Sequence, residues 1–488
     1  MKKGFRTHHP VVIIGGGVSG LTAGAFLARN GLDVQLFEAN NKLGGCCAST
    51  VVDGYMFNDG ALFLAVVEIL DDVFARVGLC LRELLPFRKV AANLSATLPD
   101  GTLVTLGEGL DLHVEGRSID ERKVRRELQA MMERWEPVLR LVSEQLVPHP
   151  FSPWRILRKG WQHFPKFRGT LASEMYRLVT DDAVRAALAG ALLYTGLPPE
   201  RAPVFAILGL VAMMSGGIYL PEGGMGRIAQ LLGAALESHG GKMFLNSKVK
   251  RIIIEDGHVC GVEVHEQGRV DAAAVISTAS PMLTYASLVD PGHIPSRTKR
   301  KLRRTRLSHR AVSLQLGLRN RIQVPSYLNM VLPSMERQRE IFTQDAEELT
   351  WLSYCVPTLI APELAPAGGS IVELFLPVPG DVPLESWDHA KKERVTESAI
   401  RALRRMHDID IAATRVRSPK DFVQDLQLYQ GALYGLPPSA GPGEQFAHTS
   451  PIPDLFLAGQ CTYPGYGVAT SAMSGIFAAQ QLLDGAAS

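Results

Sequence analysis

The sequence has few cysteines, little net charge and no long uninterrupted apolar run. Six cysteines in 488 residues are too few for a secreted scaffold held together by disulfides. The 51 basic and 49 acidic residues leave a net charge of +2, which excludes a protein whose main role is to coat nucleic acid. A hydrophobic content of 46% with 20% charged residues excludes a disordered chain.

Two long uncharged stretches are interrupted by turn-forming residues. Residues 202–221 have the length of a membrane-spanning helix, but their glycines and prolines leave an apolar block of only about ten residues, so we expect a buried helix that runs into a turn. Residues 455–483 are divided by Pro464 and nearby glycines into a strand, a loop and a helix. The polar, basic stretch 1–10 does not resemble a signal peptide. We therefore expect a cytoplasmic protein that has at most a peripheral contact with a membrane.

A glycine-rich turn between a strand and a helix is the first motif with chemical content. Val11–Ile14 has the short, β-branched composition of a strand that is buried on both faces. The turn Gly15–Gly20 follows and leads into a helical pattern that ends near Asn30. A second strand, Val34–Phe37, is closed by Glu38. The order strand, glycine turn, helix, strand and acid predicts a dinucleotide-binding unit.

Each part of this unit has a physical role. Gly15 allows the tight turn, Gly17 lets backbone N–H groups approach a pyrophosphate, and Gly20 lets the helix pack closely against the strand. The helix N-terminus, which includes Ser19, directs its partial positive charge at the phosphates. Glu38 is placed to accept hydrogen bonds from ribose hydroxyls, which disfavours a 2′-phosphate and leaves FAD or NAD.

The rest of the chain favours FAD over NAD. Gly44 and Gly45 follow Glu38 at the distance where many FAD enzymes pass their backbone beneath the extended cofactor. Near the other end of the chain, a predicted strand meets a turn at Gly459, and small residues dominate the helix after Gly467. A flat ring could lie close to that helix N-terminus, where the dipole favours negative charge on a reduced flavin. Both ends of the chain would therefore contribute to one cofactor, and no second glycine fingerprint supports an NADPH domain.

A middle segment supplies the remaining parts of the nucleotide-binding sheet. Residues 247–254 and 259–265 have strand-like patterns, and Ala273–Ala279 has the composition of a strand that returns to the sheet. Val249 is placed where such folds let a backbone amide meet adenine.

Together these segments resemble the phytoene desaturase family of FAD oxidoreductases, which includes carotenoid desaturases, carotenoid isomerases and retinol saturases. The likeness spans nearly the whole chain, and its most specific part is the block from Gly459 to Gly467. The resemblance implies an α/β protein in which a discontinuous Rossmann-type FAD domain is joined to an α+β substrate domain. The implied FAD domain comprises residues 1–90, 215–292 and 445–488, and the implied substrate domain comprises residues 91–214 and 293–444.

The motifs and the resemblance together predict a set of cofactor-binding residues. They are Gly15, Gly17, Ser19, Gly20, Glu38, Lys42, Gly44, Gly45, Val249, Gly459, Gln460, Thr462, Gly465, Gly467 and Val468. Cys46 stands where the family usually has an arginine that touches the cofactor phosphates, and Lys42 is a candidate to replace that charge. Asn58 and Ala61 stand where the family usually has aspartate and proline. These departures leave the substrate open, not the cofactor.

The implied activity is an FAD-dependent oxidoreduction of carbon–carbon bonds. Desaturation, isomerisation or saturation of a lipophilic, unsaturated substrate such as a carotenoid, isoprenoid or polyene is expected. One alternative is an amine oxidase-like flavoenzyme that acts on a C–N bond and needs an aromatic cage beside the flavin. Another is a non-catalytic lipid carrier that resembles the GDP-dissociation inhibitors. No residue spacing predicts a metal site or a catalytic acid or base, which is compatible with chemistry carried by the cofactor.

Three further features have competing interpretations. Adjacent cysteines such as Cys46 and Cys47 rarely form a disulfide, so we expect none here. Residues 150–169 contain five basic and five aromatic residues and no acid, which predicts either a peripheral membrane contact or a solvated helix that covers the substrate domain. Residues 297–310 contain eight basic residues, and we expect a solvated helix that leads into a strand at Ala311–Leu318. A second strand of the substrate-domain sheet is expected at Ile371–Pro377.

Overall fold

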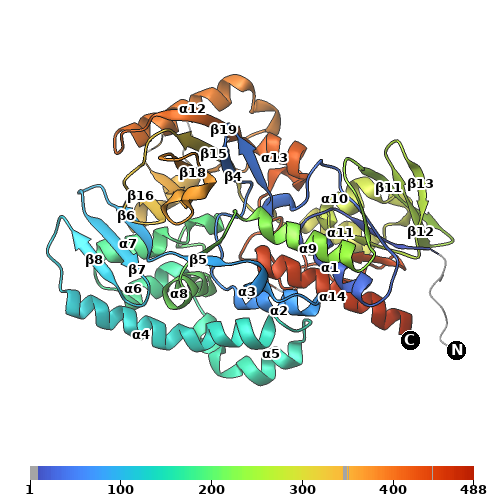
Figure 1. The fold of residues 1–488 in the computed structure, drawn as a ribbon. Coiled ribbons are helices and arrows are strands. Elements are labelled where there is room, and N and C mark those ends of the chain that lie inside the picture. The colour runs from blue at the N-terminus through green and yellow to red at the C-terminus, as the bar shows by residue number, and fades with distance from the viewer. Residues whose placement is uncertain (1–8, 344–348, 350, 442, 488) are drawn as a thin grey trace.

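A five-stranded parallel sheet forms one half of the protein in the computed structural model, which describes residues 9–343, 349, 351–441 and 443–487 (Figure 1). Its strands, in spatial order, are β10 (Lys242–Phe244), β2 (Val34–Phe37), β1 (Val11–Ile14), β14 (Ala274–Ser277) and β20 (Leu455–Leu457). Each neighbouring pair is parallel. The predicted strands β1 and β2 and the returning strand β14 are confirmed. Residues 1–8, part of the polar N-terminal stretch, lie outside the described residues.

The central strand β1 is covered on both faces, which explains its uninterrupted apolar sequence. Val11 and Ile13 pack with one layer of helices, whereas Val12 and Ile14 pack with a small antiparallel sheet. The helices are α1 (Val18–Arg29), α9 (Gly226–Ser238) and α14 (Val468–Ala487), and the small sheet is β11 (Val249–Glu255), β12 (His258–Val264) and β13 (Gly268–Asp271). Figure 1 places this small sheet at the right-hand end of the molecule, beyond the helical layer.

An eight-stranded sheet forms the other half, at the left and top of Figure 1. Its spatial order is β19 (Ile411–Arg417), β15 (Arg310–Leu318), β18 (Ser370–Val378), β17 (Leu352–Cys355), β16 (Leu328–Val331), β6 (Ala92–Thr97), β7 (Leu103–Gly107) and β8 (Leu112–Glu115). Neighbours are antiparallel except β16 and β6. The predicted strands at 311–318 and 371–377 are confirmed as β15 and β18, while the predicted limits of the two domains stay a prediction.

Helices cover one face of the large sheet and share its core. They are α4 (Glu121–Arg140), α6 (Leu171–Leu178), α7 (Asp182–Gly190) and α8 (Ile207–Gly216). The remaining elements are α2 (Glu68–Arg76), α3 (Leu81–Leu84), α5 (Pro153–Gly160), α10 (Pro281–Leu283), α11 (Ser296–Arg304), α12 (His389–Arg404), α13 (Pro419–Leu426), β3 (Ser49–Val52), β4 (Tyr55–Asn58), β5 (Phe87–Lys89) and β9 (Tyr219–Pro221).

The uncharged stretch 202–221 forms a buried helix and then a turn, as predicted. It contains α8, in which Leu210 and Met214 are fully buried, followed by a turn at Gly217 and the short strand β9. Among the described residues, the helices lack the combination of length and apolar composition that crossing a bilayer requires. The basic stretch forms helix α11, which has no buried residue and leads to β15, so that prediction is confirmed as well.

Candidate cofactor and substrate site

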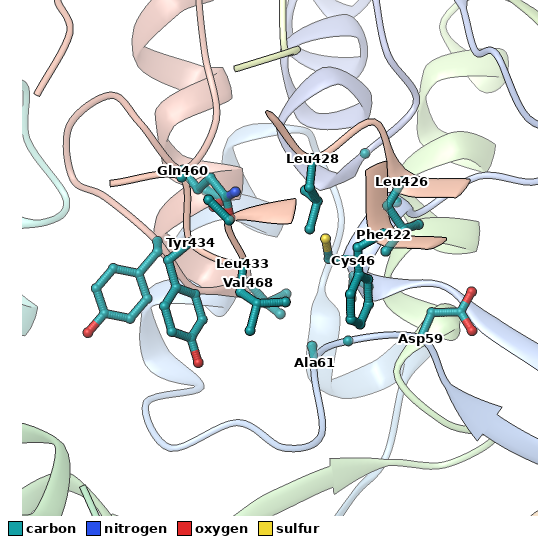
Figure 2. Close-up of a pocket in the computed structure, with 18 of the residues that line it drawn as sticks. Cys46, Asp59, Ala61, Phe422, Leu426, Leu428, Leu433, Tyr434, Gln460 and Val468 are labelled. Atoms are coloured by element: carbon teal, nitrogen blue, oxygen red, sulfur yellow. The ribbon is translucent and has the colours of Figure 1, made fainter. Parts of the chain in front are cut away.

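A cavity of about 750 Å³ is lined by residues of both sheets. Its volume falls within the range of about 300–1,000 Å³ that is usual for ligand sites. One part of the wall consists of the glycine-rich segments of the parallel sheet, and another consists of apolar side chains from the large sheet. Figure 2 shows a close-up in which Cys46, Leu428 and Phe422 lie near one another, with Leu433 and Val468 at the centre of the view.

The glycine turn after β1 leaves space where a phosphate group would lie. Gly15 has a φ of +101°, which only glycine adopts readily, and this conformation makes the turn between β1 and α1. A Cβ atom added at Gly17 would meet nothing within 4 Å, whereas one at Gly20 would lie 2.1 Å from the Gly15 carbonyl oxygen. Gly17 therefore faces open space at the N-terminus of α1, while Gly20 permits close packing.

Glu38 is fixed at the end of β2 with both carboxylate oxygens already engaged. Its Oε2 accepts a hydrogen bond from the Gly16 amide at 2.6 Å, and its Oε1 accepts one from the Asn40 amide at 2.8 Å. The side chain is only 8% exposed, and it lines the cavity. Because each carboxylate oxygen can accept a second hydrogen bond, Glu38 keeps the capacity to hold ribose hydroxyls.

The Gly44–Gly45 segment lies beside the glycine turn. The Gly44 amide donates a hydrogen bond to the Gly16 carbonyl at 2.8 Å, and a Cβ atom at Gly45 would lie 3.5 Å from the Cα of Gly17. Both glycines line the cavity. Close backbone approach at this point leaves a cradle without side chains, and an extended dinucleotide fits such a cradle.

The C-terminal block completes the wall next to the N-terminus of α14. The Thr462 hydroxyl donates a hydrogen bond to the Gly459 carbonyl at 2.8 Å, and the Gly459 amide donates one to Ser474 Oγ at 2.8 Å. Gly467 and Val468 line the cavity where α14 begins. The first N–H groups of a helix lack intrahelical partners, so this wall presents hydrogen-bond donors and a partial positive charge.

Most of the predicted cofactor residues line this one cavity. They are Gly15, Gly17, Ser19, Glu38, Gly44, Gly45, Val249, Gly459, Gln460, Gly467 and Val468. Gly20, Lys42, Thr462 and Gly465 do not line it. Gly20 and Thr462 instead shape the turns that bring their neighbours to the wall.

Lys42 takes part in a buried ion cluster around Asp59. Its ammonium group contacts Asp59 Oδ2 at 2.5 Å, Arg415 Nη1 contacts Asp59 Oδ1 at 2.6 Å, and Arg417 donates to the Asp59 carbonyl. Burial alone would raise the pKa of Asp59, but the charges of Arg417, Arg415 and Lys42 together lower it. Figure 2 shows the Asp59 carboxylate directed away from Val468 and Leu433. Lys42 is thus engaged with Asp59, and the idea that it replaces a phosphate-binding arginine stays a prediction.

Cys46 lines the cavity as a neutral thiol, because burial raises its pKa to about 11. Cys46 and Cys47 are not joined by a disulfide.

Glu373 lines the cavity and was not predicted as a site residue. It lies in β18 and is 1% exposed, and burial raises the pKa of its carboxyl to about 7 against the opposing effect of hydrogen bonds from Asn58 and Gln315. Motif analysis missed it because its neighbours come from distant segments. The available signal was a single acid within the otherwise apolar strand 371–377.

Two tyrosines line the cavity in mutual contact. The ring centroids of Tyr434 and Tyr466 are 4.7 Å apart, with an angle of 35° between the ring planes. The Tyr434 hydroxyl donates a hydrogen bond to the Tyr194 carbonyl at 3.1 Å. Rings at this separation are in van der Waals contact and leave no gap for an amine between them.

The chain is similar over nearly its whole length to two desaturases. It is 27% identical over 496 residues to a zeta-carotene-forming phytoene desaturase from Myxococcus xanthus, a match that covers 97% of this chain and 93% of the relative. It is 25% identical over 493 residues to a 4,4'-diapophytoene desaturase (4,4'-diapolycopene-forming) from Methylomonas sp, covering 94% of this chain and 92% of the relative.

Solved structures of other oxidoreductases share the fold. An oxidoreductase from Methanosarcina mazei superposes with a TM-score of 0.65 and 16% identity, covering 96% of this chain and all of the other. A variant of putrescine oxidase gives a TM-score of 0.62 and 15% identity, covering 98% and 99% of the two chains. At these identities the likeness concerns the fold alone.

The parallel sheet, its glycine turn and the C-terminal helix define a Rossmann-type α/β flavoprotein fold. The chain belongs to the family of flavin containing amine oxidoreductases, whose model matches residues 18–483. The protein is therefore an FAD-dependent oxidoreductase, and the expected cofactor class and enzyme class are confirmed by the family match.

Proposed function

We propose that this protein catalyses the desaturation, isomerisation or saturation of carbon–carbon bonds in a lipophilic polyene, such as a carotenoid or isoprenoid. The observation that carries this proposal is the apolar wall of the cavity beyond the cofactor segments. Its apolar and aromatic members include Leu193, Leu328, Met330, Leu332, Trp351, Leu374, Phe375, Phe422, Leu426, Leu428 and Leu433. The desaturases to which the chain is similar support the same substrate class.

Different groups of the proposed cofactor residues would bind different parts of FAD. Gly15, Gly17, Ser19 and the amides that begin α1 would hold the pyrophosphate, with Gly44 and Gly45 alongside. Glu38 would hold the adenosine ribose, and Val249 would meet the adenine. A second group near α14 would hold the ribityl chain and ring: Gly459, Gln460, Gly467 and Val468, supported by Thr462 and Gly465.

FAD supplies a two-electron acceptor and donor for hydride when it is bound. The chain's own residues bind and align the substrate. Burial of an apolar chain against this wall contributes about 25 cal/mol per Å² and requires no charged anchor. The apolar lining also excludes water from the reacting carbon atoms.

Anaerobic mixing of the FAD-loaded protein with polyenes tests the desaturation reaction, in which the substrate reduces the flavin. We expect the flavin absorbance band to bleach with a linear C30 or C40 polyene, and to remain unchanged with a diamine. Bleaching with the diamine alone would favour the amine oxidase alternative, against which the contact between Tyr434 and Tyr466 argues. A protein that carries a polyene but retains no FAD would favour the lipid-carrier alternative.

We also propose a peripheral membrane contact through an aromatic and cationic patch on α5 and the 3₁₀ helix Trp161–Phe167. Trp154 is 78% exposed and Trp161 is 65% exposed, which is unusual for tryptophan in contact with water. The patch comprises Phe151, Trp154, Leu157, Trp161, Phe164 and Phe167 together with Arg155, Arg158, Lys159, Lys166 and Arg168. Apolar rings that insert and cations that meet lipid phosphates are the features of an interfacial segment.

The patch is connected to the C-terminal block. The ring of Phe151 packs against that of Tyr463, with 5.5 Å between the centroids, and the Tyr463 hydroxyl donates to the Leu146 carbonyl at 2.7 Å. Tyr463 belongs to the loop 459–467, several residues of which line the cavity. A bilayer contact through this patch would thus lie next to the loop that carries part of the cavity wall.

Sedimentation with anionic vesicles tests the membrane contact. The double variant Trp154→Ala/Trp161→Ala is expected to weaken binding by about tenfold or more, because both rings lose their burial in lipid. The control Leu359→Ala removes an apolar side chain that is 45% exposed elsewhere, and it should bind like the wild type. Equal sedimentation of all three proteins, or the absence of binding by the wild type, would contradict the proposal.

A further inference from the structure

Glu373 occupies the wall of the cavity where the cofactor segments meet the substrate segments. It lies on β18 between β15 and β17, opposite Gln315 and Cys355 in the strand register. Glu373 accepts a hydrogen bond from Asn58, the last residue of β4. Asn58 and Glu373 both line the cavity. Within the described residues, no lysine, arginine or histidine forms an ion pair with Glu373.

The two carboxylate oxygens of Glu373 are unequally satisfied. Oε1 accepts hydrogen bonds from the backbone N–H of Asn58 at 2.7 Å and from Gln315 Nε2 at 3.0 Å. Oε2 accepts a single long hydrogen bond, from Asn58 Nδ2 at 3.4 Å. Because a carboxylate oxygen accepts about two hydrogen bonds, Oε2 retains a lone pair for a further proton.

Desaturation of a carbon–carbon single bond releases two hydrogen atoms in different forms. One leaves with both electrons of its C–H bond and is taken as hydride by the bound flavin, the oxidant of the proposed function. The other leaves as a proton, and the electron pair of its C–H bond becomes the new π bond. This second step requires a base within reach of the adjacent carbon.

We propose that Glu373 is this base: its Oε2 accepts the proton from the substrate carbon, and the carboxylate becomes a neutral carboxylic acid that later releases the proton to water. The inference rests on the desaturation reaction proposed above. Two other carboxylates on the wall have different roles: the remaining hydrogen-bonding capacity of Glu38 would serve ribose hydroxyls at the glycine turn, and Asp59 is surrounded by cations.

The surroundings of Glu373 tune it for proton transfer near neutral pH. Burial raises the pKa of its carboxyl to about 7, and the nearby charge of Asp59 acts in the same direction. Cys355 and Tyr327 also face it, and burial keeps both neutral by raising their pKa values. Arg415 donates a hydrogen bond to Gln315 Oε1 at 2.9 Å, and the side-chain N–H of the same Gln315 donates to Glu373. A base must be ionised, so the rate of proton removal should rise as the pH increases through about 7.

The test uses the FAD-loaded variant Glu373→Gln with a polyene that bleaches the wild type. We expect the bleaching rate to fall about 100-fold or more while FAD content is unchanged, since a general base typically contributes a factor of about 10²–10⁴. The control Glu363→Gln removes an exposed carboxylate that pairs with Arg88, and it should react at the wild-type rate.

The variant Asn58→Asp places a second carboxylate beside Glu373, so the rising part of its pH–rate profile should move to higher pH.

Infrared difference spectra give a readout that needs no substrate. A protonated-carboxyl band should titrate near pH 7 in the wild type, move to higher pH in Asn58→Asp, and be missing in Glu373→Gln. If the wild type bleaches with a polyene and Glu373→Gln bleaches equally fast with the same pH profile, the base role is wrong while the proposed function stands. If the wild type bleaches with no polyene, the desaturation reaction proposed above is wrong and the base role falls with it.

Discussion

Replacement of Gly17 with valine is expected to yield a folded protein that no longer retains FAD. A Cβ atom at this position meets nothing within 4 Å, and the φ of Gly17 is −73°, so a side chain fits the polypeptide itself. The same side chain would occupy the space next to the first amides of α1, where the pyrophosphate must lie. We expect FAD binding to weaken by about 100-fold or more, which corresponds to about 3 kcal/mol.

Flavin absorbance after gel filtration measures this loss, and circular dichroism checks the fold. Gly380→Val is the matched control, because Gly380 also has open space around it but does not line the cavity. Gly20→Ala should instead alter the fold, because its Cβ atom would lie 2.1 Å from the Gly15 carbonyl oxygen and would disturb the packing of α1. Normal FAD content in Gly17→Val would refute the phosphate-turn assignment.

Asp59→Asn is expected to lower the free energy of unfolding by about 3–5 kcal/mol, the usual cost of removing one partner of a buried ion cluster. The Asp59 side chain is 1% exposed, and its carboxylate is the anion that Lys42 and Arg415 contact directly. Its removal takes away the carboxylate that lies within 4 Å of the Arg417 guanidinium, a side chain that is 3% exposed. Urea unfolding at neutral pH measures the difference.

The free energy of unfolding at low pH supplies a second check on Asp59. Its folded pKa lies below the unfolded value, so its contribution to stability is present above the unfolded pKa and is lost as the pH falls through the folded pKa. The difference between the wild type and Asp59→Asn should therefore shrink at pH values below about 4. Asp410→Asn is the control, because its ion pair with Arg319 is exposed and contributes no more than about 1 kcal/mol. A similar small effect in both variants would contradict the role of the buried cluster.

Features encoded over short distances were predictable from the sequence. The two strands of the unit from Val11 to Phe37 were found at their observed limits because local periodicity specifies them, whereas helix α1 begins at Val18, within the predicted glycine turn. Strand β18 was predicted for the same reason, although the importance of Glu373 within it was not. That importance depends on Gln315, which the pairing of β15 with β18 brings to Glu373, and on Asn58, which approaches from β4 in a separate sheet.

The contacts of Lys42, near the cofactor segments, were also not predictable from the sequence. Its position four residues after Glu38 is visible in the sequence and suggests a contact with the cofactor. Its partner Asp59 is decided by the three-dimensional arrangement of β3, β4 and β19, which no local pattern encodes. Pairing between distant charges is a tertiary property, and it can redirect a side chain without any change in secondary structure.

The position of β20 and α14 has a consequence for how the protein is made. Strand β20 pairs with β14, and Gly475 in α14 lies so close to α1 that a Cβ atom there would be 2.1 Å from the Ser19 carbonyl oxygen. Gly475 and Ser19 are 456 residues apart in the sequence, a length that a ribosome takes about 20–90 s to synthesise. The cofactor cradle therefore cannot close during most of translation. FAD loading should accompany the last stage of folding, and the nascent chain must keep its apolar cavity wall protected until then.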